Sequence, residues 1–230
     1  MKVITFFALI LLASIGFAQT DCKPYVPVSE GSKWEQTNYS GKGKETGKIA
    51  YELLKKENTA EGYLFRIKAD SYDKKGKLTY SNTYDANCVN GEFKFDMAVK
   101  IDGAAMQSYQ SMEVDVEASD FEIPSMDLPE GSSLEDGTLT MQIGSGGVTM
   151  FRIQIDVTNR KLAAKENMTT PAGTFRCMLI TQDVTTKMVM KMENSTKEWY
   201  AEEVGMVRSE SYNKKGKLMG YSVLTMLDIK

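Results

Sequence analysis

An all-β fold built from antiparallel sheets is the architecture that this sequence predicts, and three features indicate it. Apolar and polar residues alternate over many short segments, as in residues 151–158, where Phe151, Ile153 and Ile155 are separated by polar residues. Strand side chains point alternately to the two faces, so each such run has one buried and one wet face. Glycine, asparagine and aspartate cluster between the runs. Helical periodicity is scarce, and we predict one short helix, over residues 104–111.

The hairpin turns are explicit in the sequence. Residues 71–78 read SYDKKGKL and residues 211–218 read SYNKKGKL, with a looser copy at 39–44. Aspartate or asparagine begins such a turn, and glycine accepts the left-handed conformation that ends it. The lysines could contact anionic lipid headgroups. The favoured interpretation, however, is that they keep the hairpin ends soluble and the strand edges unpaired.

The N-terminus has the pattern of a secretory signal peptide. Lys2 precedes an apolar run, Val3–Leu12, and small residues follow up to Ala18. The run is shorter than the roughly 20 apolar residues that span a bilayer. We therefore expect residues 1–18 to be cleaved and the product to be exported to the periplasm or cell surface, with no transmembrane segment. Lipid attachment at Cys22 is disfavoured, because no small-residue box directly precedes that cysteine.

A longer internal echo indicates a duplication. The matching pairs are EGSKWE at 30–35 with EGSSLE at 130–135, and TAEGY at 59–63 with TPAGT at 170–174. These pairs keep their order along the chain, as two related copies would. We predict an N-terminal β unit over 19–126 and a C-terminal β unit over 127–230, packed as one compact body. Chance similarity between glycine-rich turns is the alternative.

The three cysteines predict one disulfide in an oxidising compartment. Cys22 and Cys88 both lie among turn residues, whereas Cys177 lies in an apolar run typical of a strand interior. We predict a Cys22–Cys88 disulfide and a buried, reduced Cys177. In the chain-entropy view, closing a loop of that length stabilises the fold by roughly 4 kcal/mol.

Composition excludes several classes of function. The chain contains no histidine, which removes Ser-His-Asp and Cys-His catalysis and histidine-ligated metal sites. Glu113, Asp115 and Glu117 share one face of a predicted strand, and paired carboxylates can act as acid and base. Three carboxylates on a strand face are more often solvated. We expect no catalytic activity, metal or cofactor, and no nucleic-acid partner, because no continuous basic patch with interleaved aromatic residues occurs.

Methionine is abundant, and Met188, Met190 and Met192 alternate as they would on one strand face. Such a row packs against a core, lines a deformable apolar pocket or, less often, binds Cu(I). Our ligand-site hypothesis is the pocket, with Met150 and Phe151 of a neighbouring segment extending its wall.

The second half of the chain resembles a family of exported bacterial proteins called TapB-like, and the related families of unknown function. The residues that carry the resemblance are 134–137 (LEDG), 169–177 (TTPAGTFRC), 199–201 (WYA) and 204–208 (VGMVR). The resemblance implies a β-rich, partly open barrel or two related half-barrels of curved antiparallel sheet. In outline this is similar to the periplasmic lipoprotein carriers, which hold acyl chains on a concave sheet. It implies no active-site residues.

These observations favour a non-catalytic envelope protein that binds an apolar small molecule or lipid, or that serves a structural role. A carboxylate-dependent hydrolase and an interaction module for other envelope proteins are the alternatives.

Overall fold

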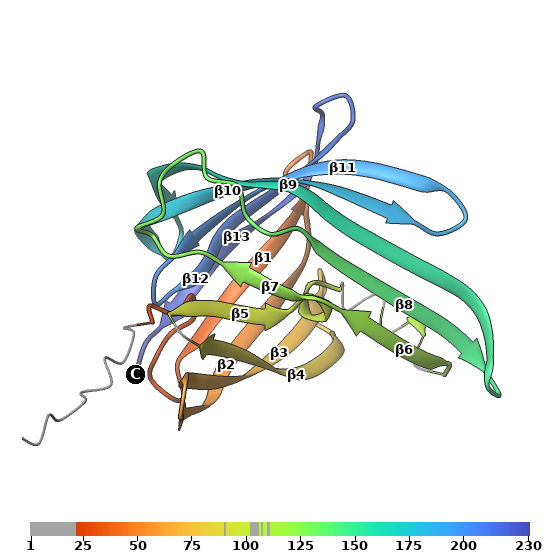
Figure 1. Ribbon diagram of the computed structural model, residues 1–230, viewed down its shortest axis with the longest axis horizontal. Helices are drawn as coiled ribbons and strands as arrows, with labels where there is room; N and C mark the ends of the chain where they lie inside the picture. Colours follow the sequence, from red (N-terminus) through yellow and green to blue (C-terminus); the bar gives the residue numbers. More distant parts are fainter. Residues whose placement is uncertain (1–21, 90, 102–105, 107, 110) are drawn as a thin grey trace, which may run out of the picture.

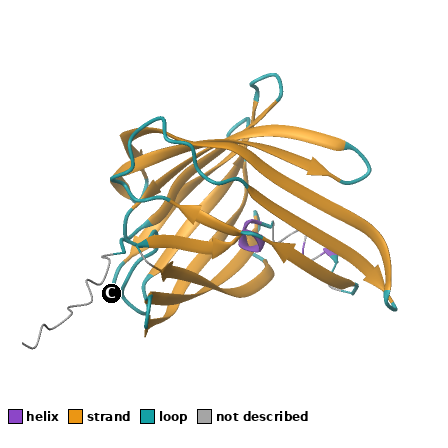
Figure 2. Ribbon diagram, in the orientation of Figure 1, coloured by secondary structure: helices purple, strands orange, loops and turns teal. Residues whose placement is uncertain are grey.

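Strands make up nearly all of the structure (Figure 2). The computed structural model describes residues 22–230 apart from residues 90, 102–105, 107 and 110. The expected signal peptide and half of the residues of the expected helix at 104–111 lie outside the described residues. The 3₁₀ helix η1, Met97–Lys100, starts where the Asp96 carboxylate accepts a hydrogen bond from the Ala98 amide at 2.7 Å. Within the described residues, no helix has the length and apolar character needed to cross a bilayer.

Thirteen antiparallel strands form one sheet that curls into a nearly closed barrel with one unsealed seam (Figure 1). The first seven strands are β1 (Lys33–Ser40), β2 (Glu45–Thr59), β3 (Gly62–Asp73), β4 (Leu78–Val89), β5 (Glu92–Asp96), β6 (Glu113–Ala118) and β7 (Asp120–Ile123). The others are β8 (Gly137–Ser145), β9 (Val148–Thr170), β10 (Gly173–Lys187), β11 (Lys191–Ala201), β12 (Gly205–Asn213) and β13 (Leu218–Asp228). Their order in the sheet is β6-β8-β9-β10-β11-β12-β13-β1-β2-β3-β4-β5-β7. The prediction of an all-β, partly open barrel is confirmed.

Strand β9 shows how the sequence pattern becomes a barrel wall. Ile153 and Val157 are buried on the inner face, while the polar residues between them lie on the outer face. Asn159 has a positive φ of 54°. At this point β9 has one more residue than the β10 segment with which it pairs. This bulge reverses the alternation, so that Arg160 and Leu162 point inward instead of Asn159 and Lys161.

The repeated Glu-Gly-Ser motif has the same geometry in both halves of the chain. In each copy the glycine amide donates to the carbonyl of a fully buried leucine, and the glutamate carboxylate accepts from the amide three residues after that leucine. The residues are Glu30, Gly31, Leu53 and Lys56 in the first copy, and Glu130, Gly131, Leu162 and Lys165 in the second. Each pair of equivalent bonds differs in length by 0.1 Å (2.8 and 2.7 Å). This correspondence supports the duplication, which stays a prediction, and both halves belong to one continuous sheet.

The cysteines pair as the sequence predicts, although Cys88 lies within β4 and not in a turn. Cys22 and Cys88 form a disulfide, which ties the segment before β1 to β4. Cys177 is a free thiol within β10, in a small cluster with Trp199 and Val207 apart from the main core. Burial raises the pKa of the Cys177 thiol to about 12. The thiol therefore stays protonated and unreactive near neutral pH.

The barrel closes because one segment of chain passes from one sheet edge to the other. Strand β6 pairs with β8, and β7 pairs with β5, with only Ser119 between them. The Ser119 amide donates to the Thr138 carbonyl (2.9 Å), and the Ser119 carbonyl accepts from the Met97 amide (3.2 Å). Ser119 thus connects β6, at one edge of the sheet, to β7, at the other edge.

Arg160 joins the two sides of the remaining seam. Its side chain is only 2% exposed, and its guanidinium lies 3.7 Å from the centre of the Phe121 ring on β7. The two terminal nitrogens donate to the carbonyls of Glu122 (2.7 Å) and Glu135 (2.6 Å), and Nε donates to the Gln182 side chain (3.3 Å). This one buried side chain, on β9, thereby links β7, β10 and the segment that precedes β8.

The hairpin topology sorts the turns between the two ends of the barrel. Successive strands are antiparallel, so the turns after β1, β3, β8, β10 and β12 all lie at one end. We call this the tip end; its turns are residues 41–44, 74–77, 146–147, 188–190 and 214–217. The C-terminus lies on the opposite side of the molecule (Figure 1).

Replacing Arg160 with methionine should lower the free energy of unfolding by about 3 kcal/mol, because two buried carbonyls lose their donors. Urea denaturation measures the change. Arg152→Met is the matched control, since Arg152 is exposed and, among the described residues, donates a 3.3 Å bond to Thr140. Equal stability of the two variants would contradict the role of Arg160 at the seam.

Peptide mapping under non-reducing conditions should recover the Cys22–Cys88 disulfide. Cys177 should react with a thiol reagent only after unfolding, because its thiol is buried and protonated. Rapid labelling of Cys177 in the native protein, or a disulfide that contains it, would contradict this arrangement.

Candidate functional site

The structure does not place the predicted ligand residues on one strand. Strand β10 ends at Lys187, which pairs with Lys191 at the start of β11. Met188 and Met190 therefore lie in the connecting turn, and only Met192 belongs to a strand. The prediction that the three methionines alternate on one strand face is wrong, because the chain must reverse direction within this stretch.

Met150 and Phe151 are neighbours on β9 and point to opposite faces of the sheet. Met150 is 64% exposed, whereas Phe151 packs against the core and against the Tyr109 ring at 5.6 Å. The five predicted residues therefore do not line one common pocket. Four of them instead lie exposed on two neighbouring hairpins, β8–β9 and β10–β11.

The exposed apolar residues of the described chain gather at the tip end. Ten large apolar side chains are exposed, and only Leu54 and Ile229 lie elsewhere. The eight at or beside tip-end turns are Leu78, Val148, Met150, Met188, Val189, Met190, Met192 and Met219. Val189 and Met190 are the most exposed of all, at 91% and 76%. Such a concentration of apolar surface marks an interaction site more often than scattered single residues do.

Sequence reasoning missed Leu78, Val148, Val189 and Met219. Each lies within or beside a hairpin turn, where apolar residues have no core to join. Apolar residues next to a glycine- or lysine-rich turn would have been the signal.

The lysine-rich turns are held in one shape by their first residue. In the β3–β4 turn, the Asp73 carboxylate accepts from the amides of Lys75 (2.8 Å) and Lys77 (3.0 Å). These bonds hold the pKa of Asp73 below its ordinary value. Gly76 supplies the positive φ of 77° that ends the turn. The β12–β13 turn repeats this arrangement with Asn213, Lys215 and Lys217 at 3.0 Å.

Most lysines of the tip end have no acidic partner. Within the described residues, no ion pair involves Lys42, Lys44, Lys74, Lys75, Lys77, Lys215 or Lys217, and all seven are exposed. By contrast, Lys191 and Lys214 both contact Glu193, and these contacts lower the pKa of Glu193 to about 2. The seven lysines outnumber the acids beside them, Asp73 and Glu45, so these three turns keep a net positive charge.

A polar groove lies on the outer face of the barrel, beneath the β12–β13 turn. It has a volume of about 550 Å³, and its walls include Asp183, Thr185, Glu193 and Asn213. Asn159 donates to Asp183 at 2.8 Å, and both residues line the groove. Hydroxyl, amide and carboxylate groups dominate these walls, so the groove suits water or a small polar ligand rather than an acyl chain.

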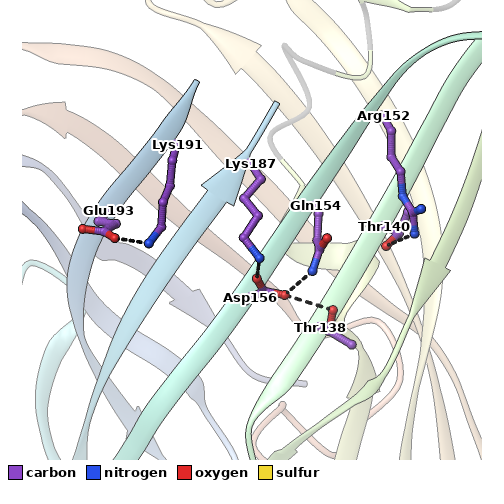
Figure 3. Close-up of polar contacts among 8 residues, drawn as sticks. All are labelled: Thr138, Thr140, Arg152, Gln154, Asp156, Lys187, Lys191 and Glu193. Atoms are coloured by element: carbon purple, nitrogen blue, oxygen red, sulfur yellow. Dashed lines mark hydrogen bonds and ion pairs between the residues drawn. The ribbon is translucent and has the colours of Figure 1, made fainter. Parts of the chain in front are cut away.

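The neighbouring outer face of β8, β9 and β10 is a network of mutually satisfied polar side chains (Figure 3). Asp156 accepts from Lys187 (2.8 Å), Gln154 (2.8 Å) and Thr138 (3.4 Å). The bond from Lys187 is the main reason why the pKa of Asp156 is lowered. This network holds the hairpins together and leaves Asp156 ionised rather than poised to accept a proton.

The carboxylates singled out from the sequence lie on the exposed face of β6. Glu113 accepts from the amides of Gly146 (3.1 Å) and Gly147 (2.9 Å), so it holds the β8–β9 turn. Asp115 and Glu117 are exposed on the same face. Across the described residues, no three cysteine, aspartate or glutamate side chains cluster closely enough to hold a metal ion.

The comparisons with known proteins identify a family and a fold. Residues 29–224 match the family described as DUF3108-like. Among curated proteins, none matches the sequence.

Two solved structures share the fold, and in both cases 90% of this chain covers 100% of the other. One is described as a "putative lipoprotein" from Parabacteroides distasonis, with a TM-score of 0.80 and 24% identity. The other is described as a "putative exported protein with YmcC-like fold" from Bacteroides fragilis, with a TM-score of 0.78 and 25% identity.

Proposed function

The chain belongs to the DUF3108-like family, and we propose that it is an exported, non-catalytic envelope protein that binds an apolar, lipid-like ligand at its tip end. The observation that carries this proposal is the gathering of eight of ten exposed large apolar side chains at one end of the barrel. The narrower kinship with TapB-like proteins is part of the same proposal.

Three observations support export. The Bacteroides fragilis relative is described as exported, and the first 18 residues have the signal-peptide pattern. The Cys22–Cys88 disulfide is typical of proteins that mature in an oxidising compartment. The Cys22 sulfur is bonded to Cys88, so the same atom does not carry a lipid thioether.

The binding surface follows from the flexible character of the apolar side chains. Five of the eight residues are methionines, which adapt to irregular apolar partners. Each buried methylene of a ligand contributes about 0.8 kcal/mol, so contact with a few exposed side chains gives useful affinity for an acyl chain. The acids of β6 and the outer-face network are solvated or already paired, which supports binding rather than catalysis as the role.

N-terminal sequencing of the protein purified from the envelope should begin at Gln19. A mature protein that starts at Met1, or one that carries lipid on Cys22, would contradict the proposed export route.

Dye-displacement titration with long-chain fatty acids tests the ligand. Wild-type protein should show saturable binding, and Met190→Glu should weaken it about tenfold, because one apolar side chain is worth about 1.5–3 kcal/mol when buried. Ile229→Glu is the matched control, since Ile229 is 53% exposed at the opposite end. It should bind as the wild type does.

Absence of saturable binding by the wild type would remove the lipid-like ligand. Equal weakening by both variants would remove the tip end as its site.

A further inference from the structure

The tip end combines two kinds of hairpin in a fixed order around the barrel. The β8–β9 and β10–β11 hairpins are adjacent in the sheet and carry the exposed valines and most of the exposed methionines. The β12–β13, β1–β2 and β3–β4 hairpins follow in sheet order and carry the seven unpaired lysines. One part of the rim is therefore apolar and the next part is basic.

The basic hairpins also carry apolar residues beside their lysines. Leu78 follows Lys77 directly, and Met219 lies two residues after Lys217. The β12–β13 and β1–β2 turns are in contact, since the Gly41 amide donates to the Met219 carbonyl at 2.7 Å. The positive charges and apolar side chains of these turns therefore form one surface.

The opposite end of the barrel has the reverse sign. Acids outnumber bases in its loops: Glu61 lies between β2 and β3, Glu203 lies between β11 and β12, and Asp127, Glu130, Glu135 and Asp136 lie between β7 and β8. Two further glutamates at this end, Glu92 and Glu202, are ion-paired with Lys94 and Lys23. The whole chain has a formal net charge of −3, so the lysine-rich rim stands out against an acidic molecule. This separation of charge along the barrel orients the tip end toward a negatively charged surface.

An extended surface accounts for this arrangement better than a single lipid molecule does. One acyl chain with one carboxylate could contact a few of the exposed methionines and one or two lysines. The seven lysines are spread over three hairpins, which requires many anionic groups presented side by side. The surface of an anionic bilayer offers such groups, with an acyl layer directly beneath them to receive apolar side chains.

We propose that the tip end docks on the surface of an anionic bilayer, with Val189 and Met190 inserting between headgroups and the lysines of the β1–β2, β3–β4 and β12–β13 turns contacting phosphates. This inference rests on the proposed function, because it names the lipid assembly that the same end recognises. The protein lies on the bilayer with its strands directed toward it and does not span it.

Vesicle sedimentation tests the proposal with the full mature chain. The wild type should bind vesicles of phosphatidylcholine mixed with phosphatidylglycerol, and it should bind pure phosphatidylcholine vesicles much more weakly. Added salt should weaken the binding, because it screens the lysines. The variant Lys74→Gln, Lys75→Gln, Lys77→Gln should lower partitioning onto the mixed vesicles at least about tenfold, because each lysine near the surface contributes about fivefold.

The matched control removes the same charge from the opposite end. Lys23→Gln, Lys94→Gln, Lys230→Gln breaks only exposed ion pairs and should bind as the wild type does. Val189→Glu, Met190→Glu should lower binding to the mixed vesicles as well. Circular dichroism melts establish that each variant is folded.

Equal binding of the wild type to both vesicle types, or equal losses in the two lysine variants, would overturn the proposal. Fatty-acid binding without vesicle binding would also overturn it and leave the proposed function intact. If the wild type binds neither fatty acids nor vesicles, both this inference and the proposed function are wrong. A protein partner would then be the next ligand to test at the tip end.

Discussion

Closure of a single sheet is the constraint on which this structure depends. A thirteen-stranded antiparallel sheet has two free edges, and exposed edges pair readily with other chains. The chain solves this by leading β6 from one edge directly into β7 at the other, with Ser119 between them. Arg160 then holds the gap that this crossing leaves, through the carbonyls of Glu122 and Glu135. A buried guanidinium serves here because it can donate to several carbonyls at once, which no apolar side chain can.

Closure also decides what the two ends of the barrel present. Every hairpin turn must lie at one end or the other, and the turns of the two ends differ in chemistry. At the tip end, Asp73 and Asn213 fold their turns by accepting backbone amides, so the lysines of those turns are left free to face solvent. At the opposite end, the disulfide and the buried tyrosine Tyr25 secure the segment before β1; the Tyr25 hydroxyl donates to the Pro124 carbonyl at 2.7 Å. The segment before β1 is therefore fixed at one end of the barrel, and exposed lysines and apolar side chains lie at the other.

This division explains why binding is proposed at the rim and not inside the barrel. The inner faces of the strands meet in one main apolar core, whose buried residues extend along the chain from Cys22 to Leu224. Eight large apolar side chains instead lie exposed at the tip end, six of them on the β8–β9 and β10–β11 hairpins. Exposed methionine and valine side chains lower the solubility of a freely diffusing protein. In a protein that contacts a lipid surface, the same side chains provide binding affinity.

The sequence by itself determined the strand content and the lysine-rich turns, because alternation and turn residues are local signals. It also predicted the Cys22–Cys88 pair, although Cys88 lies in β4 and not in the turn that its neighbours indicate. The pattern from Phe151 to Val157 survives in β9 unchanged. It fails at Asn159, where a bulge turns Arg160 into the interior, because bulges are set by pairing with β10 and by the seam. The positions of Met188 and Met190 also depended on tertiary structure. Whether an apolar residue continues a strand or caps a hairpin depends on where its partner strand begins, and distant residues set that register.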